Sequence, residues 1–140
     1  MNISVEKTDD ICVCRAVRRI VFIDEQGVSE ADEHDDLDDK CLHLLAWDGA
    51  EPVGTARILV QNNIAKIGRV CVLKSHRGMG LGATLIRVAL DLSKKQPGVN
   101  RAKLGAQVRA LGFYQALGFE AIGPVYDDAG IDHRDMVRDL

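Results

Sequence analysis

The stretch IGRVCVLKSHRGMGLGATLIRVALDLSKK, residues 67–95, decides the fold. Its first part, residues 67–73, is a short run rich in apolar and β-branched residues, which predicts a strand. Its last part repeats leucine and alanine at helical spacing over residues 81–92, and Pro97 and Gly98 then end the pattern. The stretch therefore predicts a strand, a glycine-rich turn and a helix, in that order.

Glycines fill the turn between this predicted strand and helix. Gly78, Gly80 and Gly82 alternate there, and Arg77 precedes them. A glycine inside a helix costs about 0.5–1 kcal/mol of stability, so packing alone does not account for three of them. The first N–H groups of a helix lack partners within the helix, and the helix dipole attracts anions to them. The turn therefore suits a phosphate or pyrophosphate, and the alternative is a tight turn with no ligand.

Two well-known phosphate-binding turns do not match this one. A Walker-type loop needs a lysine followed by serine or threonine, but Gly82 is followed by Ala83 and Thr84. A dinucleotide-binding fingerprint needs Gly-x-Gly-x-x-Gly and an acidic residue about 20 positions later. Here the spacing is Gly-x-Gly-x-Gly, and Asn100 and Arg101 occupy the later region.

The turn resembles the R/Q-x-x-G-x-G/A acetyl-CoA motif of the GNAT-family N-acetyltransferases, which residues 77–82, RGMGLG, match. Residues 112–119, GFYQALGF, resemble the second conserved segment of that family. VFIDEQ at residues 21–26 and GIDHRDM at residues 130–136 resemble its small ElaA-like branch, so the resemblance covers nearly the whole chain. It implies an acetyl-CoA-dependent N-acetyltransferase whose acceptor is a small-molecule or peptide amine.

Length and composition predict one domain over residues 1–140. Hydrophobic residues make up 46% and charged residues 28%, as in ordinary globular proteins. No apolar run approaches the ~20 residues of a membrane span, and no signal-peptide core is present, so we expect a cytoplasmic protein with no membrane partner. The cysteines lack zinc spacing, so we expect buried free thiols and no metal. They are Cys12, Cys14, Cys41 and Cys71.

The charge is unevenly distributed along the chain. Residues 24–39 contain nine Asp and Glu and no Lys or Arg, whereas the rest carries 12 acidic against 18 basic residues. A basic body suits an anionic cofactor, and an acidic segment beside the site would suit a cationic amine. The competing interpretation is a solvated acidic loop with no role in substrate binding.

The fold class expected is α/β, a GNAT-like mixed and mostly antiparallel sheet with a central splayed parallel strand pair, flanked by helices. The three strands before the glycine turn, residues 41–47, 52–60 and 64–73, form an antiparallel meander. After the central helix, residues 102–107 return as a parallel neighbour. An earlier helix is predicted over residues 11–23, with Arg15, Arg18 and Arg19 largely off its apolar stripe.

The resemblance also implies a set of cofactor-binding residues. In the family, acetyl-CoA lies where the two central strands separate, since the splay frees backbone groups that a regular ladder would consume. One strand would then pair with the pantetheine amides and the glycine turn with the pyrophosphate, while Gln107 stands where many members carry Asn. The set is Val70, Cys71, Val72, Arg77, Gly78, Met79, Gly80, Leu81, Gly82, Ala83, Gln107 and Phe113.

Acetyl transfer to an amine needs a neutral amine, a donor to the thioester oxygen and a proton for the leaving thiolate. By resemblance, the backbone N–H of Val72 is the donor and Tyr114 the general acid; a packing role is the alternative for Tyr114. The general base is predicted to be Glu25. An ordered water relay and other side chains stay open as alternatives, namely Asp36 with Asp38, His76 and His133.

A second functional hypothesis is a non-catalytic acyl-CoA-binding or sensor module of the same fold. The two central strands show Arg69 and Gln107 where family members often place a catalytic Glu, which is the feature in its favour. Nucleic-acid binding is disfavoured because aromatic residues are only 4% and the basic residues are dispersed. Formation of a homodimer stays open.

Overall fold

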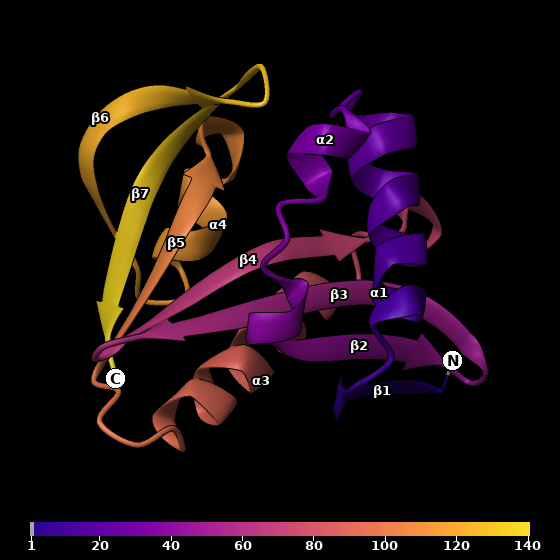
Figure 1. The fold of residues 1–140 in the computed structure, drawn as a ribbon, viewed down its shortest axis with the longest axis horizontal. Helices are drawn as coiled ribbons and strands as arrows, with labels where there is room; N and C mark the ends of the chain where they lie inside the picture. The colour runs from indigo at the N-terminus through magenta and orange to yellow at the C-terminus, as the bar shows by residue number, and fades with distance from the viewer. Residues whose placement is uncertain (1) are drawn as a thin grey trace.

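The structure, a computed structural model, describes residues 2–140, which contain one seven-stranded sheet in the order β1-β2-β3-β4-β5-β7-β6 (Figure 1). The strands are β1 (Ile3–Thr8), β2 (Leu42–Asp48), β3 (Glu51–Gln61), β4 (Ile64–Val72), β5 (Arg101–Gln107), β6 (Glu120–Asp128) and β7 (Ile131–Asp139). The helices are α1 (Ile11–Arg18), the π-helix η1 (Arg19–Glu25), α2 (Glu30–Glu33), α3 (Leu81–Lys94) and α4 (Leu111–Gln115). Short 3-10 turns are η2 (Asp38–Lys40), η3 (Lys74–His76) and η4 (Val108–Ala110).

The β4 and β5 strands form the only parallel pair of this sheet within residues 2–140. They are in register only from Ile64 opposite Arg101 to Lys66 opposite Lys103, and beyond this point they diverge, as Figure 1 shows. All other neighbouring strands are antiparallel. The expected α/β fold with a splayed central pair is therefore confirmed.

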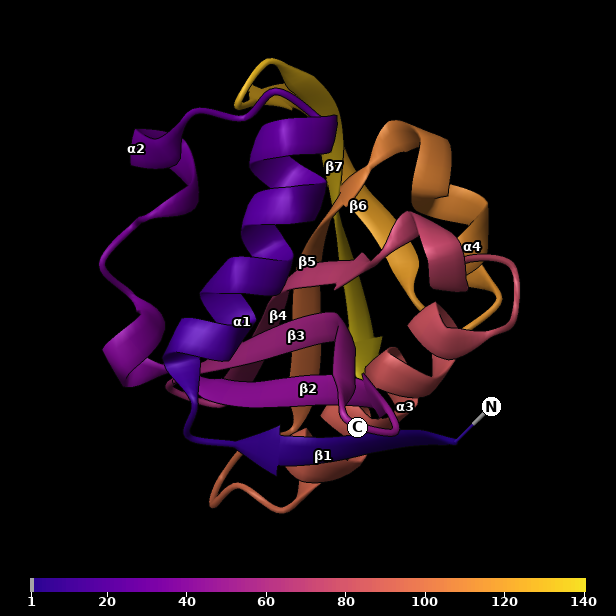
Figure 2. The ribbon, with the colours of Figure 1, turned by 90° about the vertical axis from the view of Figure 1, so that its right-hand side faces the viewer.

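Helices cover both faces of the sheet. Figure 2 shows α1 on one side and α3 with α4 on the other. The apolar stripe of α3 is fully buried at Leu85, Ile86 and Ala89, and it packs over the central strands. Burying a leucine or isoleucine side chain contributes about 1.5–3 kcal/mol, so α3 is fixed firmly and holds the glycine turn at its start in place.

The first helix begins where the sequence predicts, because Asp10 caps it by accepting a hydrogen bond from the N–H of Val13 at 3.2 Å. It continues from α1 into η1, and Val17 and Val21 pack against Cys71 of β4. The sequence places Arg18 off the apolar stripe of this helix, yet its side chain is only 1% exposed. Its guanidinium is buried because carboxylates from residues 29–40 cover it.

Residues 29–40 are held on the protein by an arginine–carboxylate network, in which Arg15, Arg18, Arg57 and Arg69 meet Glu33, Asp35 and Asp38. Of the nine acidic residues in the segment 24–39, five are ion-paired, counting Glu25 and Glu30 with the three of the network. The partners of these five carboxylates are arginines of the same chain, so these carboxylates are not simply solvated. A role of the segment in substrate binding stays a prediction. Within residues 2–140, no helix combines the length and the apolar content needed to cross a bilayer.

Candidate active site

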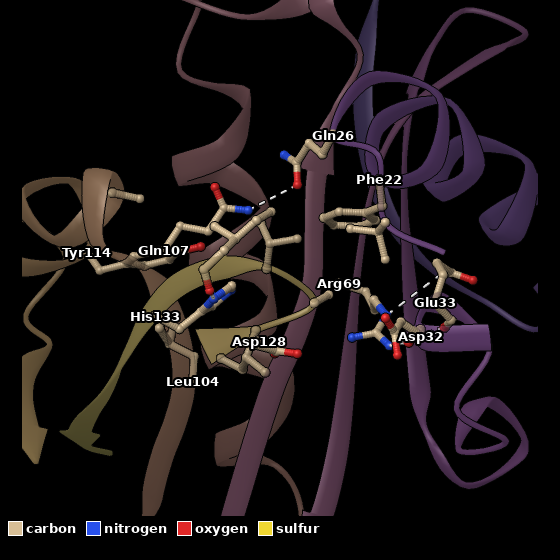
Figure 3. A pocket seen from close by; sticks show the side chains of 16 residues that line it. Phe22, Gln26, Asp32, Glu33, Arg69, Leu104, Gln107, Tyr114, Asp128 and His133 are labelled. Atoms are coloured by element: carbon tan, nitrogen blue, oxygen red, sulfur yellow. Dashed lines mark hydrogen bonds and ion pairs between the residues drawn. The ribbon is translucent and has the colours of Figure 1, made fainter. Parts of the chain in front are cut away.

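A cavity of about 230 Å³ occupies the opening between β4 and β5. Ile67 and Val70 of β4 line one side, and Leu104 and Gln107 of β5 line the other. The end of η1, α2, α4 and the tip of the β6–β7 hairpin close it, so six elements of the chain meet there (Figure 3). The splay of the parallel pair thus opens the sheet, and the cavity lies in this opening.

The glycine turn follows β4 after the short η3 turn and leads into α3. Gly80 is the N-cap of α3 at φ +83°, in the left-handed region that favours glycine, and no side chain caps this helix. The first backbone N–H of α3 to find a carbonyl belongs to Thr84, which donates to Gly80 at 3.1 Å. The six N–H groups of residues 78–83 donate to no acceptor among residues 2–140. They form a cluster of free donors at the positive end of a 14-residue helix.

Arg77 lies between this turn and the end of η1. Its Nη1 and Nη2 contact the Glu25 carboxylate at 2.5 and 2.8 Å, and its Nε donates to the carbonyl of Val72 at 2.9 Å. The hydrogen bond from Arg77 lowers the pKa of Glu25. The structure thus brings Glu25 to the predicted phosphate-binding arginine.

A β-bulge interrupts β4 beside the cavity. Arg57 of β3 pairs with Gly68 and Thr55 pairs with Cys71, so Arg69 and Val70 lie opposite a single residue of β3. Arg69 adopts φ +50°, which is unfavourable for a residue with a side chain. The bulge turns the backbone of β4 away from its neighbour and directs Arg69 to the cavity wall.

Tyr114 of α4 also lines the cavity. Burial raises the pKa of its hydroxyl to about 12, and no hydrogen bond within residues 2–140 engages that hydroxyl. Edge-to-face contacts with Phe113 and Phe119, at centroid distances of 5.0 and 6.1 Å, hold the ring. A protonated phenol with a free hydroxyl is suited to donate a proton.

His133 of β7 lines the cavity, and Figure 3 shows it on the same side as Tyr114 and Gln107. Its Nδ1 lies 2.7 Å from the carbonyl oxygen of Ile131, and a carbonyl can only accept, so Nδ1 carries a proton. In the neutral ring, Nε2 then holds the lone pair. The ring stacks on Tyr126 at a centroid distance of 6.0 Å, which fixes its plane.

The sequence model that describes the acetyltransferase (GNAT) domain matches residues 20–140. The chain belongs to the GNAT acetyltransferase family. It is 38% identical to YyaT of Bacillus subtilis over 100% of this chain and 97% of YyaT, and 34% identical to ElaA of Escherichia coli over 89% of this chain and 84% of ElaA. The predicted resemblance to the ElaA-like branch is confirmed.

Solved GNAT structures share the fold. The crystal structure of E. coli ElaA superposes with a TM-score of 0.85 at 30% identity, over 97% of this chain and 99% of ElaA. A GNAT acetyltransferase from Elizabethkingia anophelis, solved with acetyl-CoA bound, has a TM-score of 0.76 at 16% identity, over 99% of both chains.

Two of the predicted cofactor-binding residues on the central strands, Cys71 and Gln107, contact other residues of the protein. Cys71 is paired with Thr55 of β3, and its buried Sγ lies 3.2 Å from the Thr55 hydroxyl. Gln107 donates from Nε2 to Oε1 of Gln26 at 3.1 Å, which bridges β5 to the end of η1 (Figure 3). The amide at position 107 thus has a definite partner within this GNAT chain.

Phe113 lies over the helix start, because a Cβ built on Gly82 would stand 3.5 Å from its Cζ. Of the remaining base candidates, Asp36 is exposed outside the cavity, and Asp38 and His76 are engaged elsewhere. Asp38 accepts from three arginines of the network, and His76 is buried with Nε2 2.8 Å from Asp48. These two side chains stabilise the GNAT fold and do not line the cavity.

Sequence reasoning missed most of the lining residues, among them Phe22 and Gln26, near the C-terminal end of η1, and Asp128 at the hairpin tip. The lining comes from four separate parts of the chain, residues 22–33, 67–70, 104–114 and 128–133, so no single local pattern marks it. The VFIDEQ segment was the available signal for two of them, since it contains both Phe22 and Gln26. Within residues 2–140, no group of three or more His, Cys, Asp or Glu could hold a metal ion.

Proposed function

We propose that this chain is an acetyl-CoA-dependent N-acetyltransferase that moves an acetyl group to a primary amine by direct attack within a ternary complex. One observation carries the proposal. The free N–H groups of residues 78–83 lie at the end of the same strand, β4, that forms one wall of the cavity. An elongated ligand with a diphosphate and a reactive end fits such an arrangement. The acetyl-CoA held by the E. anophelis relative supports this choice.

The residues present fit acetyl-CoA, which would supply the thioester. The amides of residues 78–83 would bind its pyrophosphate, and the backbone of residues 70–72 would bind the pantetheine arm. Arg77 adds a positive charge beside the turn. Phe113 and Gln107 complete the proposed site, at the helix start and at the cavity wall.

Tyr114 is the proposed general acid. The amine nitrogen forms a bond to the thioester carbonyl carbon, and the carbon–sulfur bond breaks as the amide product forms. The departing thiolate takes the Tyr114 proton, and the backbone N–H of Val72 is the proposed donor to the thioester oxygen. Since burial raises the pKa of Tyr114 to about 12, its hydroxyl keeps the proton until the thiolate forms.

His133 is the residue to which we assign removal of the proton from the amine. Its Nδ1 proton points at the Ile131 carbonyl, so Nε2 is free to accept, and the ring lines the cavity with Tyr114. The alternative, Glu25, stays a prediction. Its bidentate pair with Arg77 lowers its pKa, and a carboxylate with a lowered pKa is a weaker base.

Two measurements test the proposed function. Isothermal titration with acetyl-CoA should show binding at sub-millimolar concentration, and a thiol reagent should detect CoA release that depends on an added primary amine. Absence of acetyl-CoA binding would remove the proposal altogether.

A non-catalytic acyl-CoA sensor is the second candidate, favoured by the absence of any Asp or Glu from β4 and β5. The sensor hypothesis requires acetyl-CoA binding without amine-dependent CoA release. Release of CoA that increases with amine concentration therefore excludes the sensor. Binding of acetyl-CoA without CoA release, tested with a panel of primary amines, excludes the transferase.

A further inference from the structure

Arg69 has hydrogen-bonding capacity that the protein does not use. Its side-chain hydrogen bonds all involve Nη2, which donates to the carbonyls of Asp32 and Glu33 and to the Asp35 carboxylate at 3.1–3.2 Å. Nε is buried without a partner and lies 3.8 Å from Glu33 Oε1, and no hydrogen bond within residues 2–140 involves Nη1. The side chain is still 24% exposed, and it lines the cavity.

The charges around Arg69 do not balance. The arginine–carboxylate network holds four guanidinium groups and three carboxylates, and the tightest contacts of the carboxylates go to Arg18 and Arg57. Burial, and after it the charge of Arg57, lowers the pKa of Arg69. One positive charge of the network is therefore poorly compensated, and it is the one at the cavity wall.

The bulge that places Arg69 there is itself unfavourable. A left-handed backbone at a residue with a side chain costs energy and persists where the surroundings enforce it, often at ligand sites. In a regular strand Arg69 would not adopt φ +50°. The strained backbone and the placement of the Arg69 side chain at the cavity therefore arise from the same bulge.

An opposite charge lies across the cavity. Asp128, at the tip of the β6–β7 hairpin, lines it without an ion pair to Arg69, and Figure 3 shows its carboxylate directed toward the Arg69 side. The lining also contains the apolar side chains of Phe22, Val28 and Ile131, and on the Arg69 side the acidic residues Asp32 and Glu33. A ligand with one positive end, one negative end and an apolar side chain matches this distribution.

We infer that the acceptor is an amino acid with an apolar side chain, whose carboxylate binds Arg69 while its ammonium group is attracted by Asp128. The inference rests on the proposed function and names the substrate class of the same site. A simple alkylamine leaves the Arg69 charge uncompensated, and a polyamine adds positive charge beside it. An amino acid supplies the missing carboxylate and still presents an amine.

A matched set of acceptors tests the inference: L-leucine, L-leucinamide and 3-methylbutylamine share one side chain and differ only at the carboxylate. L-phenylalanine, its amide and 2-phenylethylamine form a second set. With the full chain and saturating acetyl-CoA, kcat/KM for at least one amino acid should exceed that of its amide and of its decarboxylated amine at least tenfold. Equal or faster turnover of the two analogues in both sets overturns the inference.

Arg69→Gln should remove the preference. We expect kcat/KM for the preferred amino acid to fall at least tenfold while that of its decarboxylated amine changes less than threefold. Arg69→Lys should restore part of the preference, since it keeps the charge without the planar fork. Arg101→Gln, which removes an arginine paired with Asp139 far from the cavity, should leave all acceptors unchanged.

The decarboxylated amine is an internal measure of folding. If Arg69→Gln only damages the structure, all acceptors lose activity by the same factor and the preference persists, which contradicts the inference. If the native protein acetylates amines but shows no preference for a carboxylate, the inference fails and the transferase function stands. If it binds acetyl-CoA but acetylates no amine, the proposed function fails and the inference falls with it.

Discussion

The guanidinium of Arg77 and the carboxylate of Glu25 form a bidentate ion pair between segments 52 residues apart in the chain, with Nη2 2.8 Å from Oε1. Arg77 opens the glycine turn, and Glu25 ends η1, which supplies part of the cavity wall. The pair therefore joins the proposed pyrophosphate site to the helix that borders the proposed acceptor site. Arg77, which would attract an anionic cofactor, is thus already paired with a carboxylate.

The Glu25→Gln variant separates the two roles of this carboxylate. Because the change removes a negative charge beside Arg77, we expect acetyl-CoA to bind about two- to fivefold more tightly, with kcat within threefold of the native value. An exposed ion pair contributes only about 0.2–1 kcal/mol, so stability should change little. Titration calorimetry and steady-state kinetics measure both quantities.

Asp24→Asn is the control for Glu25→Gln, since Asp24 is a neighbouring exposed carboxylate outside the ion pairs of residues 2–140. It should alter neither affinity nor kcat. A loss of kcat of about 10²-fold or more in Glu25→Gln, the size expected for removal of a general base, would return that role to Glu25.

Tyr114→Phe should lower kcat about 10²- to 10⁴-fold and change acetyl-CoA affinity less than threefold, because the hydroxyl is needed only as the thiolate leaves. The ring, which makes the contacts with Phe113 and Phe119, is kept. Tyr126→Phe is the matched control, since it removes a phenol whose hydroxyl donates to Asp135 at 2.7 Å outside the cavity. Equal kcat in native protein and Tyr114→Phe would reduce Tyr114 to a packing residue.

His133→Gln should lower kcat/KM at neutral pH about 10²- to 10⁴-fold if the imidazole accepts the amine proton. The pH dependence of kcat/KM tests the role of the imidazole more specifically. Protonation of the base should produce an acidic limb in kcat/KM for the native protein, and this limb should be absent or displaced in the variant. Persistence of the same acidic limb in His133→Gln would assign it to another group.

The glycine turn and α3 could be predicted because their signals are local. Helical spacing over residues 81–92 and the three alternating glycines are visible within one stretch, and the buried stripe of α3 agrees with them. The antiparallel meander was likewise marked by its turns at Asp48-Gly49 and Asn62-Asn63.

The burial of Arg18 could not be predicted from its own helix. Taken alone, the helical pattern places Arg18 on the polar face, and its partners Glu33 and Asp38 come 15 and 20 residues later in a segment without strong periodicity. The role of Arg69 was hidden for a similar reason. Its bulge arises from the register between β3 and β4, and the spacing of residues within β4 does not reveal it.

Asp38→Asn should destabilise the fold by about 3–5 kcal/mol, because it leaves Arg18 buried beside a weakened partner. Burial alone would raise the pKa of Asp38, but hydrogen bonds from Arg18, Arg15 and Arg57 outweigh it and hold the pKa well below its ordinary value. A carboxyl group whose pKa is depressed on folding contributes stability above its unfolded pKa, about 3.9, and that stability is lost as the pH falls below it.

The free energy of unfolding should therefore decline between about pH 5 and pH 2 in the native protein and decline less steeply in Asp38→Asn, as urea titrations at several pH values would measure. Asp36→Asn is the control. Asp36 lies in the same segment at φ +61°, which Asn tolerates well, and it takes no part in the network, so the change should stay within about 0.5 kcal/mol. A similar loss in both variants would remove the special role of Asp38.

Gly80→Ala and Gly82→Ala should have opposite effects on stability, although the two residues are only two positions apart. Gly80 is held at φ +83°, where a Cβ is unfavourable, so alanine should cost about 1–2 kcal/mol and weaken acetyl-CoA binding as the turn shifts. Gly82 has helical geometry within α3, and a Cβ there would meet Phe113 Cζ at 3.5 Å, an ordinary contact. Alanine at this position should add about 0.5–1 kcal/mol, because glycine is a poor helix former.

The acetyl-CoA motif accepts glycine or alanine at the position of Gly82, so Gly82→Ala should leave acetyl-CoA affinity within about threefold of native. Thermal unfolding measures the stability of each variant, and calorimetric titration measures its affinity for acetyl-CoA. Of these four quantities, only the stability of Gly82→Ala should rise above the native value. The free amides explain this pattern, since a methyl group on Gly82 leaves the N–H donors of residues 78–83 in place, whereas a changed backbone at Gly80 moves them. Strong loss of affinity in Gly82→Ala with unchanged affinity in Gly80→Ala would mean that the diphosphate does not bind at these amides.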